Sequence, residues 1–110
     1  MTYKVYFEKY FNQSLTALIS RSLADPERAE DRFLEVKSFC RSFDELPNRM
    51  KGVRSATDPL RYTWFPSGRP SLYFLAAVVD EAKLEVTFVA AGDAGRGKAS
   101  FESELKRSAD

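Results

Sequence analysis

The chain opens with the alternation of a β-strand. Tyr3, Val5 and Phe7 alternate with more polar positions, a period of two that predicts a strand with one buried face. After Asn12 the spacing of apolar residues changes to three and four, which predicts a first helix. The apolar positions of that helix are Leu15, Leu18, Ile19 and, less regularly, Leu23.

A second helix is predicted to begin at Asp25 and Pro26. An aspartate at this place accepts backbone N–H bonds of the first turn, and a proline is tolerated there because its missing N–H has no partner to lose. Pro47 is expected to end the helix. One apolar stripe runs between these limits, formed by Ala29, Phe33, Val36, Cys40 and Phe43.

The second half of the chain has the pattern of three strands. A loop of about a dozen residues, 48–59, comes first, and its length in a small domain suggests a binding role. The strands are predicted at 60–65, 72–79 and 84–88, with turns at 66–68 and 80–83 between them. Because 72–79 is apolar on both faces, it is expected to be the central strand of an antiparallel meander.

These elements define one domain over residues 1–110 of the α+β class. Their order is β-α-α-β-β-β, with a helical hairpin packed on a small antiparallel sheet. Near the end of the chain, Phe101 and Leu105 lie one helical turn apart, which permits a short C-terminal helix.

Composition excludes several classes of site. The chain has 110 residues, of which 44% are hydrophobic and none is histidine, so the usual neutral-pH general base and histidine metal ligands are absent. The single Cys40 forms neither an internal disulfide nor a cysteine-rich zinc site, and its place in the helical stripe indicates a core residue. We therefore expect no metal and no cofactor.

The same survey gives an expectation for location. The first residues carry charges within every apolar stretch, unlike a signal peptide, and no run of 18 apolar residues suits a membrane span. Together with the cysteine usage, this predicts a cytoplasmic protein with no membrane partner.

The charge of the chain is unevenly distributed. The overall net charge is only +1, yet residues 49–69 alone carry +4, while residues 1–48 carry −1 and residues 70–110 carry −2. The basic residues of the positive segment are Arg49, Lys51, Arg54, Arg61 and Arg69, opposed by Asp58. If the hairpin brings Arg61 and Arg69 to adjoining strands, with Arg96 and Lys98 nearby, a concave basic surface results. Such a surface suits phosphate groups.

Aromatic residues are interleaved with these charges. Tyr62, Trp64, Phe65 and Tyr73 are candidates for stacking against unpaired bases. The alternative is structural, because Tyr62 and Trp64 share a strand face with Leu60 and such residues commonly fill a core. Basic loops are also often merely solvated.

The order of elements and several local strings resemble the RelE/ParE superfamily of small bacterial toxins from type II toxin–antitoxin systems. The resemblance covers nearly the whole chain. It rests on the opening YKVYF strand followed by two helices, on NRMKG, and on SGRPSLYFLAAVVDEAKLEVTFVAAGDAGRG.

For RelE-type members the resemblance implies a ribosome-dependent, metal-independent endoribonuclease that cuts mRNA. Basic residues would orient the scissile phosphate and stabilise developing charge. The matching positions give Arg61, Arg69 and Arg96 as catalytic residues. Lys51, Arg54, Lys98 and Tyr73 would bind RNA. The expected partners are an antitoxin, the ribosome and mRNA.

Two positions depart from the RelE pattern. Thr63 stands where a second strand lysine is expected, and Phe101 stands near the place of a catalytic tyrosine, although a phenyl ring transfers no proton. Whether the protein is an enzyme therefore stays open. The alternatives are a non-catalytic ParE-like inhibitor of DNA gyrase and a non-toxic binding or immunity module.

Overall fold

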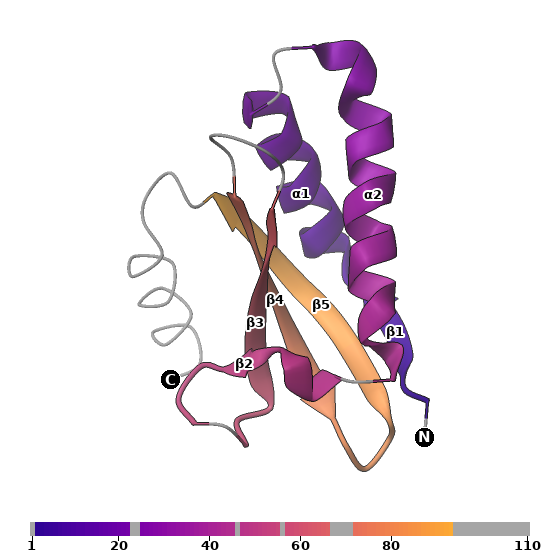
Figure 1. Ribbon diagram of the computed structural model, residues 1–110, viewed down its shortest axis with the longest axis vertical. Coiled ribbons are helices and arrows are strands. Elements are labelled where there is room, and N and C mark those ends of the chain that lie inside the picture. Colours follow the sequence, from indigo (N-terminus) through magenta and orange to yellow (C-terminus); the bar gives the residue numbers. More distant parts are fainter. Residues whose placement is uncertain (1, 23–24, 46, 56, 67–71, 94–110) are drawn as a thin grey trace.

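In a computed structural model, the described part of the chain forms a five-stranded mixed sheet with two α-helices (Figure 1). The structure describes residues 2–22, 25–45, 47–55, 57–66 and 72–93. The helices are α1 (Lys9–Ser22) and α2 (Ala29–Arg41). The strands are β1 (Lys4–Phe7), β2 (Lys51–Gly52), β3 (Leu60–Pro66), β4 (Leu72–Asp80) and β5 (Glu85–Asp93).

The order of strands across the sheet is β1-β5-β4-β3-β2. β3, β4 and β5 form the predicted antiparallel meander with β4 in the centre, and the residues from Tyr73 to Ala77 are fully buried. The prediction of a purely antiparallel sheet was wrong at one edge, because β1 pairs with β5 in parallel, with Val5 opposite Val86. β2 adds a fifth strand within the predicted loop.

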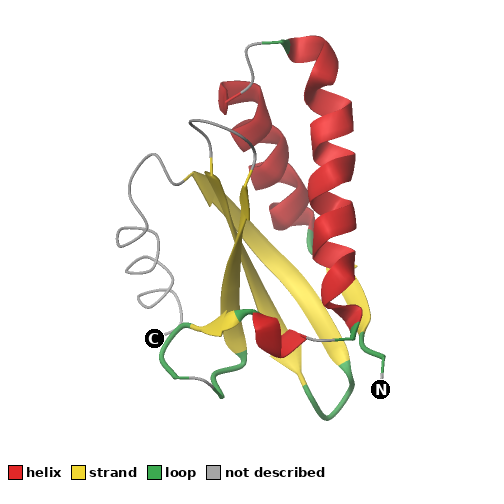
Figure 2. Ribbon diagram, viewed as in Figure 1, coloured by secondary structure: helices red, strands yellow, loops and turns green. Residues whose placement is uncertain are grey.

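Both helices cover one face of the sheet, which Figure 2 shows in red beside the yellow strands. Phe11 and Leu15 of α1 and Val36 of α2 are fully buried against sheet residues such as Phe88. Burying a large apolar side chain contributes roughly 1.5–3 kcal/mol, so this layer is the main source of stability. The α+β class and the helical hairpin are thus confirmed.

The first helix begins earlier than predicted. α1 starts at Lys9, and its first backbone bond runs from the Asn12 N–H to the Glu8 carbonyl at 3.2 Å. The reason is Phe11, which lies one turn before Leu15 and is fully buried with it. A polar Asn12 therefore lies within the helix, where its side chain accepts a hydrogen bond from Lys37 of α2 at 2.8 Å.

The second helix begins nearly as predicted and ends sooner. The Asp25 carboxylate accepts a bond from the Glu27 N–H at 3.0 Å, capping a 3-10 turn, Pro26–Arg28, that leads into α2. The α-helix stops at Arg41, and further 3-10 turns carry the chain through Pro47. Cys40 lies in the core as expected, and burial raises the pKa of its thiol far above the usual range. It is not a reactive thiol.

A second, smaller core lies on the sheet face away from the helices. Its buried members are Val53, Tyr62, Phe74 and Ala76. Because successive residues of a strand point to opposite faces, even-numbered positions of β3 lie on this side and odd-numbered ones face the helices. Phe65, for example, packs edge-on against Phe39 of α2 with ring centroids 5.3 Å apart. This alternation decides where the predicted basic residues lie.

Candidate functional site

Lys51 lies on the sheet face away from the helices. It is opposite Tyr62 in the register of β2 and β3, so the two side chains share that face. Lys51 is exposed, and its Nζ is 5.8 Å from the ring centroid of Trp64. A cation at this distance lies at the outer limit of attraction to an indole. Lys51 and Trp64 together form a small surface, called here the Lys51–Trp64 patch.

Trp64 is the aromatic residue of the patch that remains accessible. Its side chain stands edge-on to Phe74, with centroids 5.9 Å apart and planes at 84°, and the residue keeps 38% of its surface exposed. Tyr62, by contrast, is 8% exposed and belongs to the second core. The sequence prediction that both rings fill a core holds for Tyr62 only. An exposed indole beside a lysine suits stacking against a base and contact with its phosphate.

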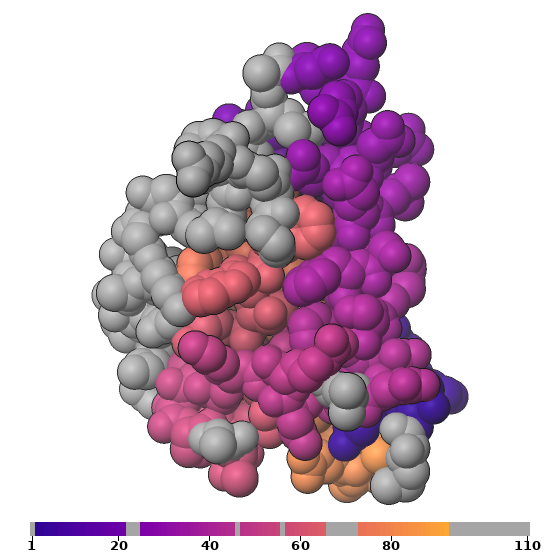
Figure 3. Space-filling model, viewed as in Figure 1, coloured from indigo at the N-terminus to yellow at the C-terminus, as the bar shows by residue number. Residues whose placement is uncertain are grey.

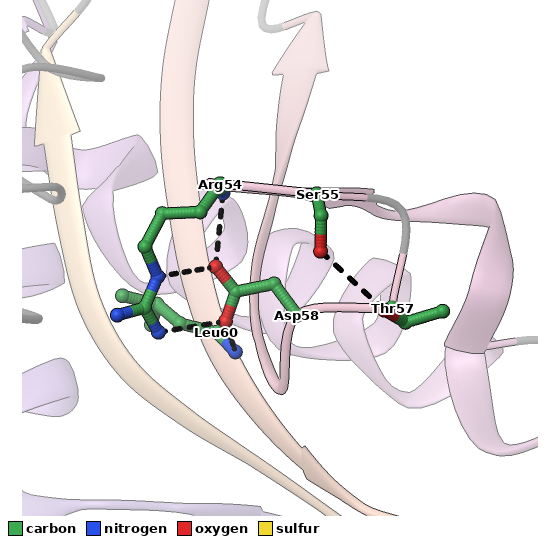
Figure 4. A network of polar contacts seen from close by, with 5 residues as sticks. All are labelled: Arg54, Ser55, Thr57, Asp58 and Leu60. Carbon is green, nitrogen blue, oxygen red and sulfur yellow. Dashed lines mark hydrogen bonds and ion pairs between the residues drawn. The ribbon is translucent and has the colours of Figure 1, made fainter.

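Arg54 and Asp58 form a clasp that closes the connection between β2 and β3 (Figure 4). The Asp58 carboxylate accepts bonds from Arg54 Nε at 2.8 Å and Nη2 at 2.9 Å, and from the backbone N–H of Arg54 at 2.9 Å. It also accepts one from the Leu60 N–H at 3.0 Å. Four donors on one nearly buried carboxylate fix the shape of the loop that follows Lys51.

The clasp changes the ionisation of Asp58 and the role of Arg54. The hydrogen bonds from the Arg54 side chain, helped by the Leu60 and Arg54 amides, hold the pKa of Asp58 well below its usual range despite burial. With two nitrogens of its guanidinium committed to Asp58, Arg54 positions the loop. The sequence analysis interpreted Asp58 as an opposing charge in a loop and did not predict the clasp, although its spacing of four from Arg54 was a visible signal.

Arg61 lies on the other face of the sheet from Lys51. It pairs with Gly52 of β2 and Ala77 of β4, and Ala77 belongs to the core beneath the helices. Arg61 is 5% exposed, and its Nη1 donates to the Met50 carbonyl at 3.4 Å. Because Lys51 and Arg61 are on opposite faces, the structure does not unite them in the single basic surface expected from the sequence.

Tyr73 is fully buried, which argues against the RNA-binding role expected of it. Its ring lies on the helix side of β4 and stacks on Phe65 with centroids 6.2 Å apart. A ring with no exposed surface offers no face to a base. Thr63 also points to the helix side, opposite Leu75. The remaining predicted residues, Arg69, Arg96 and Lys98, and also Phe101, lie outside the described residues.

The segment around the clasp contributes to the molecular surface. In the space-filling view, the magenta to pink atoms around residues 50–60 gather at the lower left of the face shown (Figure 3). Within the described residues no cluster of acidic or cysteine side chains is arranged to hold a metal ion. Over the same part of the chain, no helix combines the length and apolar character of a membrane span.

Comparison with solved structures decides the fold. The RelBE2 toxin–antitoxin complex of Mycobacterium tuberculosis contains a chain that superposes with a TM-score of 0.58 at 18% identity, covering 84% of this chain and 99% of that one. A mutant of the E. coli toxin RelE in the free state gives 0.53 at 22% identity, covering 97% and 98%. The chain has the RelE fold. No protein-family model matches the sequence, and no curated protein sequence does either.

The RelE fold accounts for the arrangement found here. The two helices lie on one face of the sheet, and on the opposite face of β2 and β3 the exposed Lys51 and Trp64 form the Lys51–Trp64 patch beside the second core. The similarity to the RelE mutant covers almost the full length of both chains.

Proposed function

We propose that this protein is the toxin of a toxin–antitoxin pair and that it cuts messenger RNA on the ribosome. The observation that carries the proposal is the RelE fold over 97% of the chain, since the similar structures are a toxin–antitoxin complex and a toxin. The positive charge of residues 49–69 and the exposed Lys51 are consistent with an RNA partner.

In the proposed reaction, a ribose 2′-hydroxyl attacks the adjacent phosphorus atom. The bond from phosphorus to the 5′-oxygen breaks, leaving a cyclic phosphate. The chain has no histidine, and the proposal assigns both proton transfers to water: the hydroxyl proton passes to solvent, and the departing 5′-oxygen takes a proton from solvent. Lys51 stabilises the negative charge that develops on the phosphate oxygens. Trp64 stacks on a neighbouring base, and the Arg54–Asp58 clasp positions Lys51 by fixing the loop after it.

The basic residues that lie outside the described part of the chain are included in the same proposal. Arg69, Arg96 and Lys98 would add cations around the phosphate. Arg61 is not assigned a phosphate contact, because it is buried on the face opposite Lys51. The proposed partner that neutralises the toxin is an antitoxin protein, and the proposed site of action is the bacterial cytoplasm.

The test is controlled expression in a bacterial host. We expect the wild type to arrest growth and to leave mRNA with new ends inside codons, and Lys51→Ala to relieve both effects. Lys83→Ala is the matched control, because Lys83 is an exposed lysine in the turn after β4.

Two results would contradict the cleavage proposal. Growth arrest with intact mRNA and gyrase-dependent DNA breaks would favour the ParE-like alternative instead. Harmless expression of the wild type, verified as folded, would favour a binding or immunity module.

A further inference from the structure

Arg61 is a buried cation, and few hydrogen bonds compensate for the loss of its contact with water. Its guanidinium carries five N–H donors, yet its contact is one long bond from Nη1 to the Met50 carbonyl at 3.4 Å. Nε is buried and has no hydrogen-bond partner. The ion pairs found among the described residues are Arg32 with Glu35 and Arg54 with Asp58, so no acidic side chain there neutralises Arg61.

Such an arrangement is costly in the isolated protein. An arginine cannot escape by losing its proton, and an uncompensated charge out of water costs several kcal/mol. A hydrophobic residue would fill the same place at lower cost. The site is therefore incomplete as it stands, and a ligand that supplies negative charge would stabilise it.

Arg61 opens into a cavity that can receive such a ligand. The cavity has a volume of about 370 Å³, which is in the range of small-ligand sites. It lies at the end of β4, beside the connection that precedes β3. Its lining residues, with Arg61, are Thr57, Pro59, Val78, Val79, Asp80 and Glu81. We call this cavity the Arg61 pocket.

The lining combines one buried cation with two carboxylates. Asp80 is half-buried and Glu81 is exposed, and neither forms an ion pair with Arg61. A chain of phosphates would meet Arg61 but would be repelled by Asp80 and Glu81. A single carboxylate flanked by positive groups complements all three charges.

We propose that the Arg61 pocket binds a carboxylate side chain of a partner protein, within a segment where basic residues flank that carboxylate. The carboxylate accepts hydrogen bonds from the Arg61 guanidinium, and the flanking cations pair with Asp80 and Glu81. The inference goes beyond the proposed RNA cleavage and does not depend on it, because Arg61 and Lys51 lie on opposite sheet faces.

The test is a titration of the full chain, labelled with ¹⁵N in arginine, followed by NMR at the Arg61 Nε–H signal. The probes are the capped peptide Lys-Glu-Lys, its Lys-Gln-Lys counterpart and a five-nucleotide RNA. We expect Lys-Glu-Lys to shift the Arg61 signal and to bind at least about 10-fold more tightly than Lys-Gln-Lys, since the amide cannot form a charged pair with guanidinium.

Variants separate the pocket from general charge effects. Arg61→Met should abolish the preference for the glutamate peptide, measured by calorimetry, while Lys51→Ala should keep it. If Arg61→Met does not fold, the double variant Asp80→Asn/Glu81→Gln, altered only at the rim, should weaken Lys-Glu-Lys binding several-fold. Equal binding of the two peptides, a preference that survives Arg61→Met, unchanged binding by the rim variant, or a larger Arg61 response to RNA would overturn the proposal.

Discussion

Asp58 binds Arg54 twice over, through the side chain and through the backbone. Its two carboxylate oxygens lie 2.8 and 2.9 Å from Arg54 Nε and Nη2, and one of them also accepts the Arg54 amide at 2.9 Å. The two residues enclose the turn between β2 and β3, and Figure 4 shows the carboxylate directed at the guanidinium. The edge strand β2, which carries Lys51, is therefore held to β3 by the bonds of the clasp as well as by its own short pairing with β3.

Substitution of Asp58 by asparagine is expected to destabilise the protein. The amide keeps the volume but loses the charge, and it cannot accept bonds on both of its terminal atoms, so about 1–3 kcal/mol of unfolding free energy should be lost. Chemical denaturation followed by circular dichroism measures the difference. Glu45→Gln removes an exposed carboxylate and serves as the control, with an expected change below about 0.5 kcal/mol. Equal effects of the two substitutions would refute a structural role of the clasp.

The clasp also predicts a pH dependence. Because the pKa of Asp58 is lower in the folded protein than in the unfolded chain, its stabilising contribution is complete above about pH 4 and decreases as the pH falls further. The difference in stability between the wild type and Asp58→Asn should therefore be constant from pH 5 to 8 and shrink below pH 4. Denaturation curves at several pH values measure this difference. A difference that grows on acidification contradicts the assigned ionisation.

Gly52 is predicted to tolerate no side chain. A Cβ at this position would overlap the Ser55 carbonyl oxygen and lie 2.8 Å from the carbonyl carbon, so the backbone of the clasp would have to move. We expect Gly52→Ala to cost more than about 2 kcal/mol in thermal or chemical denaturation. Ser55→Ala, which loses a 3.4 Å contact with Thr57, should change little. A stable Gly52→Ala protein would show that the loop has a different conformation.

Trp64 offers a direct probe of the proposed RNA surface. It is the one tryptophan of the sequence and is 38% exposed, so stacking of a base should quench its fluorescence. A short single-stranded RNA is expected to quench the signal at low salt, with binding weakened about 10-fold in Lys51→Ala and unchanged in Lys83→Ala. The quenching should decrease as salt is added, because phosphate contacts release counterions. Absence of quenching would exclude Trp64 from the RNA contact.

Local patterns predicted most of the elements. The strand over Tyr3 to Phe7 and the central position of β4 were evident because burial repeats with the period of the backbone. The parallel pairing of β1 with β5 was not, since it joins residues about 80 positions apart and depends on the whole topology. β2 was missed because two residues are too short to carry a pattern.

The candidate site was less predictable than the fold. Alternation along β3 places Arg61 on the helix side, yet charge counted along the sequence does not distinguish the faces of a strand. Tyr73 was predicted to bind RNA because its aromatic ring is able to stack on a base. Its place on the central strand instead explains why it is buried. Lys51 is exposed, as a residue expected to bind RNA must be, and it lies on an edge strand.

The most direct test of the proposed function uses purified components. Ribosomes stalled on a defined mRNA are incubated with the protein, and the new RNA ends are mapped. The account predicts cleavage within the codon at the decoding site, dependent on ribosomes, unaffected by removal of divalent metal under conditions that keep ribosomes intact, and reduced about 10²-fold in Lys51→Ala. Intact mRNA after incubation with folded wild-type protein would contradict it.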